Sequence, residues 1–150
     1  MRFYFVDRIT DLVPGQRIRG YKNVAMSEPY FATHFPGFPV VPGVVLIEAM
    51  AQLAGLLVET TPEGKDRKAL LSIVDRVKFK KMVRPGDRVD LAADLVLIDE
   101  EGARVEVAAS VDGEAIAQTR LTFVLLKVPA PFVEVLAQER AALLHALRRR

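Results

Sequence analysis

The sequence predicts an α+β fold, with an antiparallel β-sheet wrapped around one long central α-helix and a second helix at the C-terminus. Segments rich in β-branched and apolar residues, separated by turn signals, predict the sheet. One long segment that is apolar on every side predicts the central helix. A stretch of helical periodicity after a Pro-Ala-Pro linker predicts the terminal helix.

The predicted strands follow one another closely along the chain. Asp112-Gly113, between two apolar runs, indicates a two-residue hairpin turn, and Pro85-Gly86-Asp87 and Asp99 to Gly102 mark two more turns. Successive strands joined by short turns have to be mostly antiparallel, because parallel neighbours need a long crossover. We expect strands at residues 16–25, 69–74, 88–98, 104–111 and 114–126.

The central helix is predicted over residues 42–58, PGVVLIEAMAQLAGLLV. A helix that has no polar face is normally buried. Pro42 suits the first turn, where a missing N–H costs no intrahelical hydrogen bond. A sheet that curls around this helix is the simplest way to bury it.

The chain has 150 residues, which is enough for one substantial core. We expect a domain at residues 1–127 and a helical extension at residues 128–150, whose final Arg148 to Arg150 suit the negative end of a helix dipole. In the extension, Arg140 interrupts an apolar helical face. That face predicts packing on the domain or on an oligomer neighbour, and a basic helix for a membrane surface or partner is the alternative. Its residues are Val133, Leu136, Ala137, Leu144 and Leu147.

Composition excludes several classes of function. The chain has no cysteine, which excludes disulfides and thiolate chemistry and fits a reducing compartment. The net charge of +2 gives no reason to expect nucleic acid as a partner. No apolar run reaches the roughly 18–20 residues that a membrane span needs, and the start of the chain, MRFYFVDRITD, lacks the apolar core of a signal peptide. We expect a cytoplasmic protein without stable membrane insertion and, since metal-ligand spacing is missing, without a metal site.

Glu48 is the only ionisable side chain between His34 and Glu59, and it lies within the apolar helix. A carboxylate buried there alone is costly, so it either stays protonated or acquires a partner. A carboxyl group that is protonated near neutral pH is what a general acid requires. The alternative is a structural glutamate hydrogen-bonded to Gln52, one turn further on.

His34 is one of two histidines and begins a loop with prolines at every third position, which restrict the backbone. An imidazole held on a stiff apolar loop suits a base; a satisfied core or turn histidine is the alternative.

Gly43 lies at the amino end of the predicted helix, where free N–H groups and the helix dipole favour a developing negative charge. A glycine that only the turn after Pro42 requires is the alternative. Together with His34 and Glu48, it suggests abstraction of a proton next to a carbonyl, with an acid ready for a leaving group. The spacing does not determine whether His34 and Glu48 meet within one chain.

The stretch Asn23 to Gln52, NVAMSEPYFATHFPGFPVVPGVVLIEAMAQ, resembles the signature of bacterial (3R)-hydroxyacyl-acyl-carrier-protein dehydratases of fatty-acid synthesis. The resemblance continues in FVDRITDLVPGQRI at Phe5 to Ile18, in IVDRVKFKKMVRPGDRV at Ile73 to Val89, and in the hairpin around Asp112-Gly113. It covers most of the chain up to about Leu126.

This resemblance implies a hotdog fold that works as a homodimer with its sites at the dimer interface; a tetramer or hexamer stays open as a larger assembly. It implies that His34 takes the C2 proton, that Glu48 of the other protomer helps the 3-hydroxyl leave as water, and that the Gly43 amide polarises the thioester carbonyl. No cofactor is implied, because the substrate carries phosphopantetheine from the acyl carrier protein, the expected partner. Candidate walls of an apolar acyl tunnel are Phe31, Phe35, Val41 and Val45.

Two departures from the family motivate alternatives. Thr33 stands where the family commonly has glycine, and the chain continues beyond the usual last strand. A non-catalytic, acyl-carrier-binding subunit with the same fold is one alternative, and an acyl-thioester hydrolase on that fold is another.

A basic segment precedes the predicted strand at residues 88–98. Its first cationic side chains alternate with apolar ones, so as a strand they would form one basic face. Acyl carrier proteins are acidic, which makes this face a candidate docking surface. An edge strand that lysines protect from aggregation is the alternative. The segment contains Arg76, Lys78, Lys80, Lys81 and Arg84.

Overall fold

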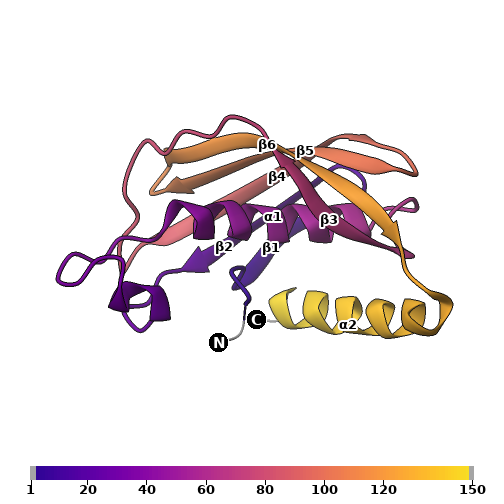
Figure 1. The fold of residues 1–150 in the computed structure, drawn as a ribbon, viewed down its shortest axis with the longest axis horizontal. Coiled ribbons are helices and arrows are strands. Elements are labelled where there is room, and N and C mark those ends of the chain that lie inside the picture. Colours follow the sequence, from indigo (N-terminus) through magenta and orange to yellow (C-terminus); the bar gives the residue numbers. More distant parts are fainter. Residues whose placement is uncertain (1–2, 149–150) are drawn as a thin grey trace.

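One antiparallel sheet curls around a central helix in the computed structural model, which describes residues 3–148 (Figure 1). The strands are ordered β1-β2-β4-β5-β6-β3, and every neighbouring pair is antiparallel. This is the hotdog fold, and the predicted α+β class is confirmed. The elements are β1 (Arg8–Val13), β2 (Arg17–Asn23), the 3-10 helix η1 (Pro29–Ala32), α1 (Gly43–Glu59), β3 (Arg67–Val74), β4 (Arg88–Ile98), β5 (Gly102–Val111), β6 (Glu114–Lys127) and α2 (Ala130–Arg148).

Local chemistry explains the long β5–β6 hairpin. Asp112 and Gly113 have φ angles of 51° and 78°, the left-handed conformation that a type I′ turn needs at both central residues. The sequence did not predict β1, an edge strand of which only Ile9 is fully buried. With one buried side chain, β1 has too weak an apolar alternation to be recognised.

The helix α1 forms the centre of the core. Its most deeply buried side chains pack under β2, β3, β4 and β5. The prediction of a helix buried all round is wrong on one side, since Val44 is 72% exposed and Glu48 and Gln52 are half-buried. The sheet covers only part of the helix, and an apolar sequence alone does not distinguish a core face from an open one. The fully buried residues are Met50, Leu53, Ala54, Leu57 and Val58.

The basic segment after β3 is not a strand, so its alternating cationic residues do not form the single basic face that a strand would give. It runs beside β6, but its only main-chain bonds to β6 are those from Asp75 N to Arg120 O (3.0 Å) and from Lys80 N to Ile116 O (2.8 Å) within the described residues. Two separated bonds hold the segment in place without forming a regular ladder.

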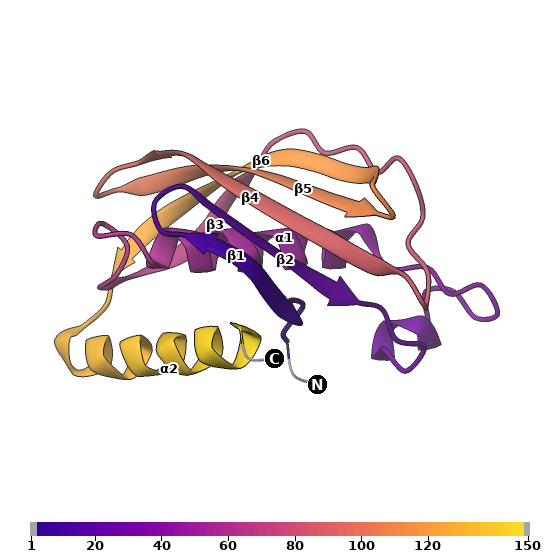
Figure 2. The same cartoon turned by 180° about the vertical axis from the view of Figure 1, so that it is seen from behind.

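The helix α2 crosses the open side of α1 and contacts β1 (Figure 2). Arg140 does not interrupt its inward face, because the guanidinium is mostly buried and pairs with Glu59 (3.2 Å). Leu143 joins the predicted inward residues, and Ala137 is exposed. Arg149 and Arg150 of the predicted helix lie outside the described residues. No helix within residues 3–148 is long and apolar enough to cross a membrane.

Candidate active site

His34 lies in the loop between η1 and α1. Its Nδ1 is 2.8 Å from Val40 O, and Val40 N donates to His34 O (3.1 Å). A carbonyl oxygen can only accept, so Nδ1 carries the hydrogen and a neutral ring keeps the lone pair on Nε2. The ring also stacks on Phe35, with 4.1 Å between centroids. The loop thus fixes an imidazole in the tautomer that a base requires.

Thr33, which stands before His34 where the family commonly has glycine, fits the conformation of this loop. Its backbone has φ −126° and needs no glycine. Its amide and hydroxyl both point to Tyr30 O, at 3.3 and 3.5 Å, at the end of η1.

Gly43 begins α1, whose N-cap Pro42 supplies no side-chain hydrogen bond. Pro42 O accepts from Val45 N and Leu46 N, whereas the Gly43 amide is one of the first-turn donors for which a helix has no internal acceptor. A Cβ on Gly43 would lie 2.7 Å from the Phe79 ring. Close packing of an aromatic ring is therefore a further reason for glycine here.

Glu48 is half-buried on the open face of α1 and accepts a hydrogen bond from Gln52 Nε2 (3.0 Å). Gln52 also donates to Phe3 O (2.9 Å) and accepts from Phe5 N (2.8 Å), so it ties the N-terminal segment to α1. The contact expected of a structural glutamate is present. Glu48 also faces open space, which is what a reactive carboxyl needs.

A groove of about 270 Å³ runs along this open face and contains Glu48. His34 does not line it, and within residues 3–148 no hydrogen bond joins the two side chains. One chain therefore does not bring the predicted base and acid together. The groove is lined by Phe3, Tyr4, Val6, Glu48, Ala51, Gln52, Gly55, Leu56, Glu59, Lys68, Ala69, Leu71, Phe123, Leu143 and Leu147.

The four candidate tunnel residues lie elsewhere in the single chain. Phe31 and Val41 are buried in the core, Val45 is partly buried against it, and Phe35 is exposed. None of them lines the Glu48 groove.

Tyr30, in the same motif, is half-buried and carries a buried hydroxyl group. Within residues 3–148 its hydroxyl has no hydrogen-bond partner. Burial, and then the charges of Glu28 and Asp7, raise the pKa of this hydroxyl well above its usual value.

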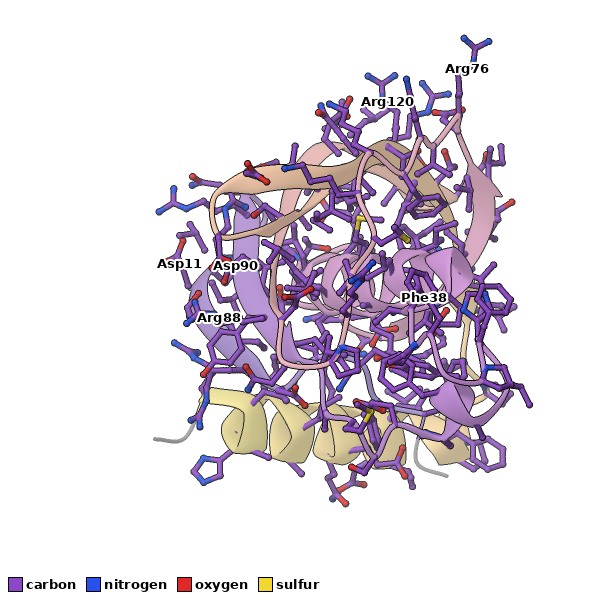
Figure 3. All side chains as sticks on the ribbon, turned by 90° about the vertical axis from the view of Figure 1, so that its left-hand side faces the viewer. Asp11, Phe38, Arg76, Arg88, Asp90 and Arg120 are labelled. Carbon is purple, nitrogen blue, oxygen red and sulfur yellow. The ribbon has the colours of Figure 1, made fainter. Side chains whose placement is uncertain are left out.

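The five basic residues do not act as one face. Lys81 pairs with Glu114, and the Arg84 guanidinium lies 4.8 Å from the centre of the Phe38 ring. Arg76, Lys78 and Lys80 line a shallow depression together with Glu106 and Arg120. Figure 3 shows Arg76 and Arg120 projecting from the edge of the molecule opposite α2.

Sequence reasoning missed Glu59 as a functional or structural residue. It is 4% exposed at the end of α1, pairs with Lys68 (2.8 Å) and Arg140 (3.2 Å), and accepts from Ala69 N (3.0 Å). A charge that ends an apolar helix was the available signal. Among residues 3–148, no group of three or more His, Cys, Asp or Glu side chains is arranged to hold a metal ion.

The fold and the His34 loop define a hotdog protein with a fixed imidazole at its surface. A family model described as a FabA-like domain matches residues 1–120. The chain is 41% identical over 123 residues to 3-hydroxyacyl-acyl-carrier-protein dehydratase FabZ of Bacillus velezensis, covering 82% of this chain and 87% of that protein. It is 43% identical over 122 residues to the FabZ dehydratase of Nitratidesulfovibrio vulgaris, covering 80% and 79%. The chain therefore belongs to the FabA-like family.

A solved structure, a hypothetical thioesterase protein with coenzyme A from Streptococcus pneumoniae, shares the fold. Its TM-score is 0.62 at 13% identity, covering 82% of this chain and 88% of that one. At this identity the likeness concerns the fold alone.

Proposed function

We propose that this chain removes water from (3R)-3-hydroxyacyl thioesters on an acyl carrier protein, to give trans-2-enoyl thioesters in cytoplasmic fatty-acid synthesis. The single observation that carries the proposal is an imidazole whose Nε2 has no hydrogen-bond partner within residues 3–148, in a motif shared with an acid on α1. The two relatives that are named as dehydratases, at 41% and 43% identity, support it.

The proposed reaction takes one proton from C2 and gives one proton to the oxygen that leaves C3. His34 Nε2 takes the proton from C2 while the Gly43 amide donates a hydrogen bond to the thioester oxygen. The C2–H electron pair becomes the second bond of C2=C3, the C3–O bond breaks, and the proton of Glu48 goes to the departing hydroxyl to form water. Exchange with solvent then returns the proton from His34 to Glu48. These steps need no cofactor.

The separation of His34 from the Glu48 groove supports a site shared between two subunits. β3 ends the sheet, and within residues 3–148 no strand pairs with its outer edge. Exposed apolar residues along a free edge favour pairing with a second copy. We propose a homodimer joined through β3, in which each His34 meets the other subunit's Glu48. The exposed apolar residues on β3 are Leu70, Leu71, Ile73 and Val74.

The carrier would dock on the basic segment. Arg76, Lys78 and Lys80 are exposed and line one depression, which suits an acidic partner. Lys81 and Arg84 extend the positive charge along the same segment, although each is already engaged by a neighbour.

The first test is incubation of the purified protein with 3-hydroxydecanoyl acyl carrier protein, followed by mass spectrometry. We expect a product lighter by one water. Release of free acid and carrier thiol would instead identify a thioester hydrolase. Tight binding of the carrier without turnover would identify a non-catalytic subunit.

The second test decides whether the site is shared. Alone, each of His34→Ala and Glu48→Gln is expected to lower kcat by about 10²–10⁴-fold. If each site takes one residue from each subunit, half the dimers in an equal, fully exchanged mixture carry one intact site, so about a quarter of wild-type activity returns. A mixture as inactive as its components would contradict a shared site.

A further inference from the structure

The Glu48 groove has two chemically different ends. Glu48, Gln52, Gly55 and Glu59 lie on one side of α1, because their spacing of four, three and four residues repeats the helical turn. From Glu48 to Glu59 the helix rises by about 16 Å. The residues between these two carboxylates give the groove mainly apolar walls.

The helix α2 closes one side of this groove. Leu143 and Leu147, one helical turn apart, both line it and are partly buried. The views in Figures 1 and 2 agree that α2 lies on the side of α1 that the sheet leaves uncovered. Without these two side chains, the groove would open to solvent along the side that α2 covers.

Arg140 fixes α2 in this position. Its guanidinium pairs with Glu59 (3.2 Å) and donates to Lys65 O (2.8 Å) and Arg67 O (3.5 Å). The side chain is only 12% exposed. Three acceptors on two separate segments hold this arginine, so the wall that α2 forms has a fixed position relative to α1.

The far end of the groove is charged. Glu59 and Lys68 both line it and form an ion pair with 2.8 Å between Oε1 and Nζ. An alkyl chain that passed this point would have to separate or desolvate the pair, which is costly. The groove therefore has a carboxyl for chemistry at one end and a barrier to alkyl groups at the other.

We propose that Leu143 and Leu147 of α2, together with the Glu59–Lys68 pair, determine the longest acyl chain that the protein accepts. This inference rests on the proposed function, because it takes the acyl chain of the thioester as the occupant of the Glu48 groove. Leu143 and Leu147 are specificity-determining residues that touch the chain and take no part in proton transfer.

The experiment compares substrates and unreactive ligands of increasing length. The substrates are 3-hydroxyhexanoyl and 3-hydroxyhexadecanoyl carriers, scored by the ratio of kcat/KM. The ligands are S-alkyl pantetheine thioethers from butyl to hexadecyl, scored by Kd in calorimetry. Leu143→Ala with Leu147→Ala widens the groove, and we expect the preference for the long chain over the short one to rise about tenfold, the effect of one or two methylene groups in an apolar pocket.

Two further variants keep the test decisive. Gly55→Leu fills the groove from the α1 side, where a Cβ meets only Phe123, at 4.0 Å, and should shorten the longest chain bound even if the double variant fails to fold. Val135→Ala removes an exposed apolar side chain from the outer face of α2 and should leave the length profile unchanged.

Identical length profiles in wild type, the folded double variant and Gly55→Leu would overturn the inference, as would an equal change in Val135→Ala. The experiment distinguishes failure of the α2-wall proposal from failure of the dehydratase proposal. Thioether affinities that shift as expected, in a protein that dehydrates no substrate, would support the α2 wall and reject the dehydratase. Dehydration with unchanged length profiles would support the dehydratase and reject the α2 wall.

Discussion

Glu48 and Glu59 lie on the same side of the same helix, three turns apart, and differ in nearly every other respect. Glu59 is almost fully buried and is held by Lys68, Arg140 and the Ala69 amide. Glu48 is half-buried, and its one hydrogen-bond donor within the described residues is the neutral Gln52.

Under the proposed function, this difference separates a structural carboxylate, Glu59, from a reactive one, Glu48. A carboxylate that accepts from two cations and an amide is held in one position by charge-assisted hydrogen bonds. A carboxyl group that has a single neutral partner and faces a groove is accessible to a substrate, which the proposed proton transfer requires. The hydrogen-bond and ion-pair partners of the two carboxyl groups, rather than the depth of burial alone, are therefore the reason to propose Glu48 as the reactive one.

Exchanging each carboxyl for an amide tests this comparison most directly. We expect Glu48→Gln to lower kcat by about 10²–10⁴-fold, because the amide has no proton to give the departing hydroxyl. His34→Ala should lower kcat by a similar factor, because the variant lacks the base that takes the C2 proton. Dehydration of 3-hydroxydecanoyl carrier measures both effects, and urea unfolding should place both variants near wild type. Near-normal turnover in either variant would remove it from the mechanism.

Glu59→Gln should have the opposite effect, which is a loss of stability without a large loss of turnover. It leaves the buried Arg140 guanidinium without an anion, so we expect the free energy of unfolding to fall by about 3 kcal/mol. Urea denaturation followed by circular dichroism measures the change. Turnover of the short 3-hydroxyhexanoyl carrier, whose chain does not reach the Glu59 end of the groove, should remain close to wild type per folded protein. A large loss of kcat with unchanged stability would reverse the roles of the two carboxyl groups.

The two cations that pair with Glu59, Arg140 and Lys68, should contribute unequally to the free energy of unfolding. Arg140 is mostly buried and bonds to two carbonyls as well, so Arg140→Ala should cost about 2 kcal/mol. The Lys68 side chain is 47% exposed, and solvent screening should limit the cost of Lys68→Ala to less than about 1 kcal/mol. Equal unfolding midpoints for the two variants would show that the burial of the cation does not determine how much each ion pair stabilises the protein.

Tyr30 extends the comparison to a buried group that has no partner within residues 3–148. Tyr30→Phe removes an unsatisfied hydroxyl and should raise the free energy of unfolding by about 1 kcal/mol near neutral pH.

The raised pKa of Tyr30 also gives a pH dependence. Above the ordinary tyrosine pKa the unfolded chain loses this proton while the folded chain keeps it, so the native state loses stability as pH rises through that range. Unfolding midpoints measured from neutral to strongly alkaline pH should fall less steeply in Tyr30→Phe. If the unfolding midpoints of wild type and Tyr30→Phe fell equally with pH, the raised pKa of the Tyr30 hydroxyl would be contradicted.

Local patterns in the sequence determined much of this protein. The Asp112-Gly113 turn, the strands at β4, β5 and β6 and the helix α1 follow from backbone preferences and apolar spacing that act over a few residues. The candidate acid, base and amide could be named because each has an unusual neighbourhood in the sequence.

Only the tertiary structure decided which of these residues lie together. Arg140 interrupts an apolar pattern when read along the chain, yet in space it meets a carboxylate from α1. The open face of α1, the irregular path of the segment at residues 75–80 and the place of Leu143 in the Glu48 groove likewise depend on which surfaces the sheet covers. Periodicity reports which face of an element is apolar, whereas the contacts between distant segments depend on how whole elements pack, and that information is not local.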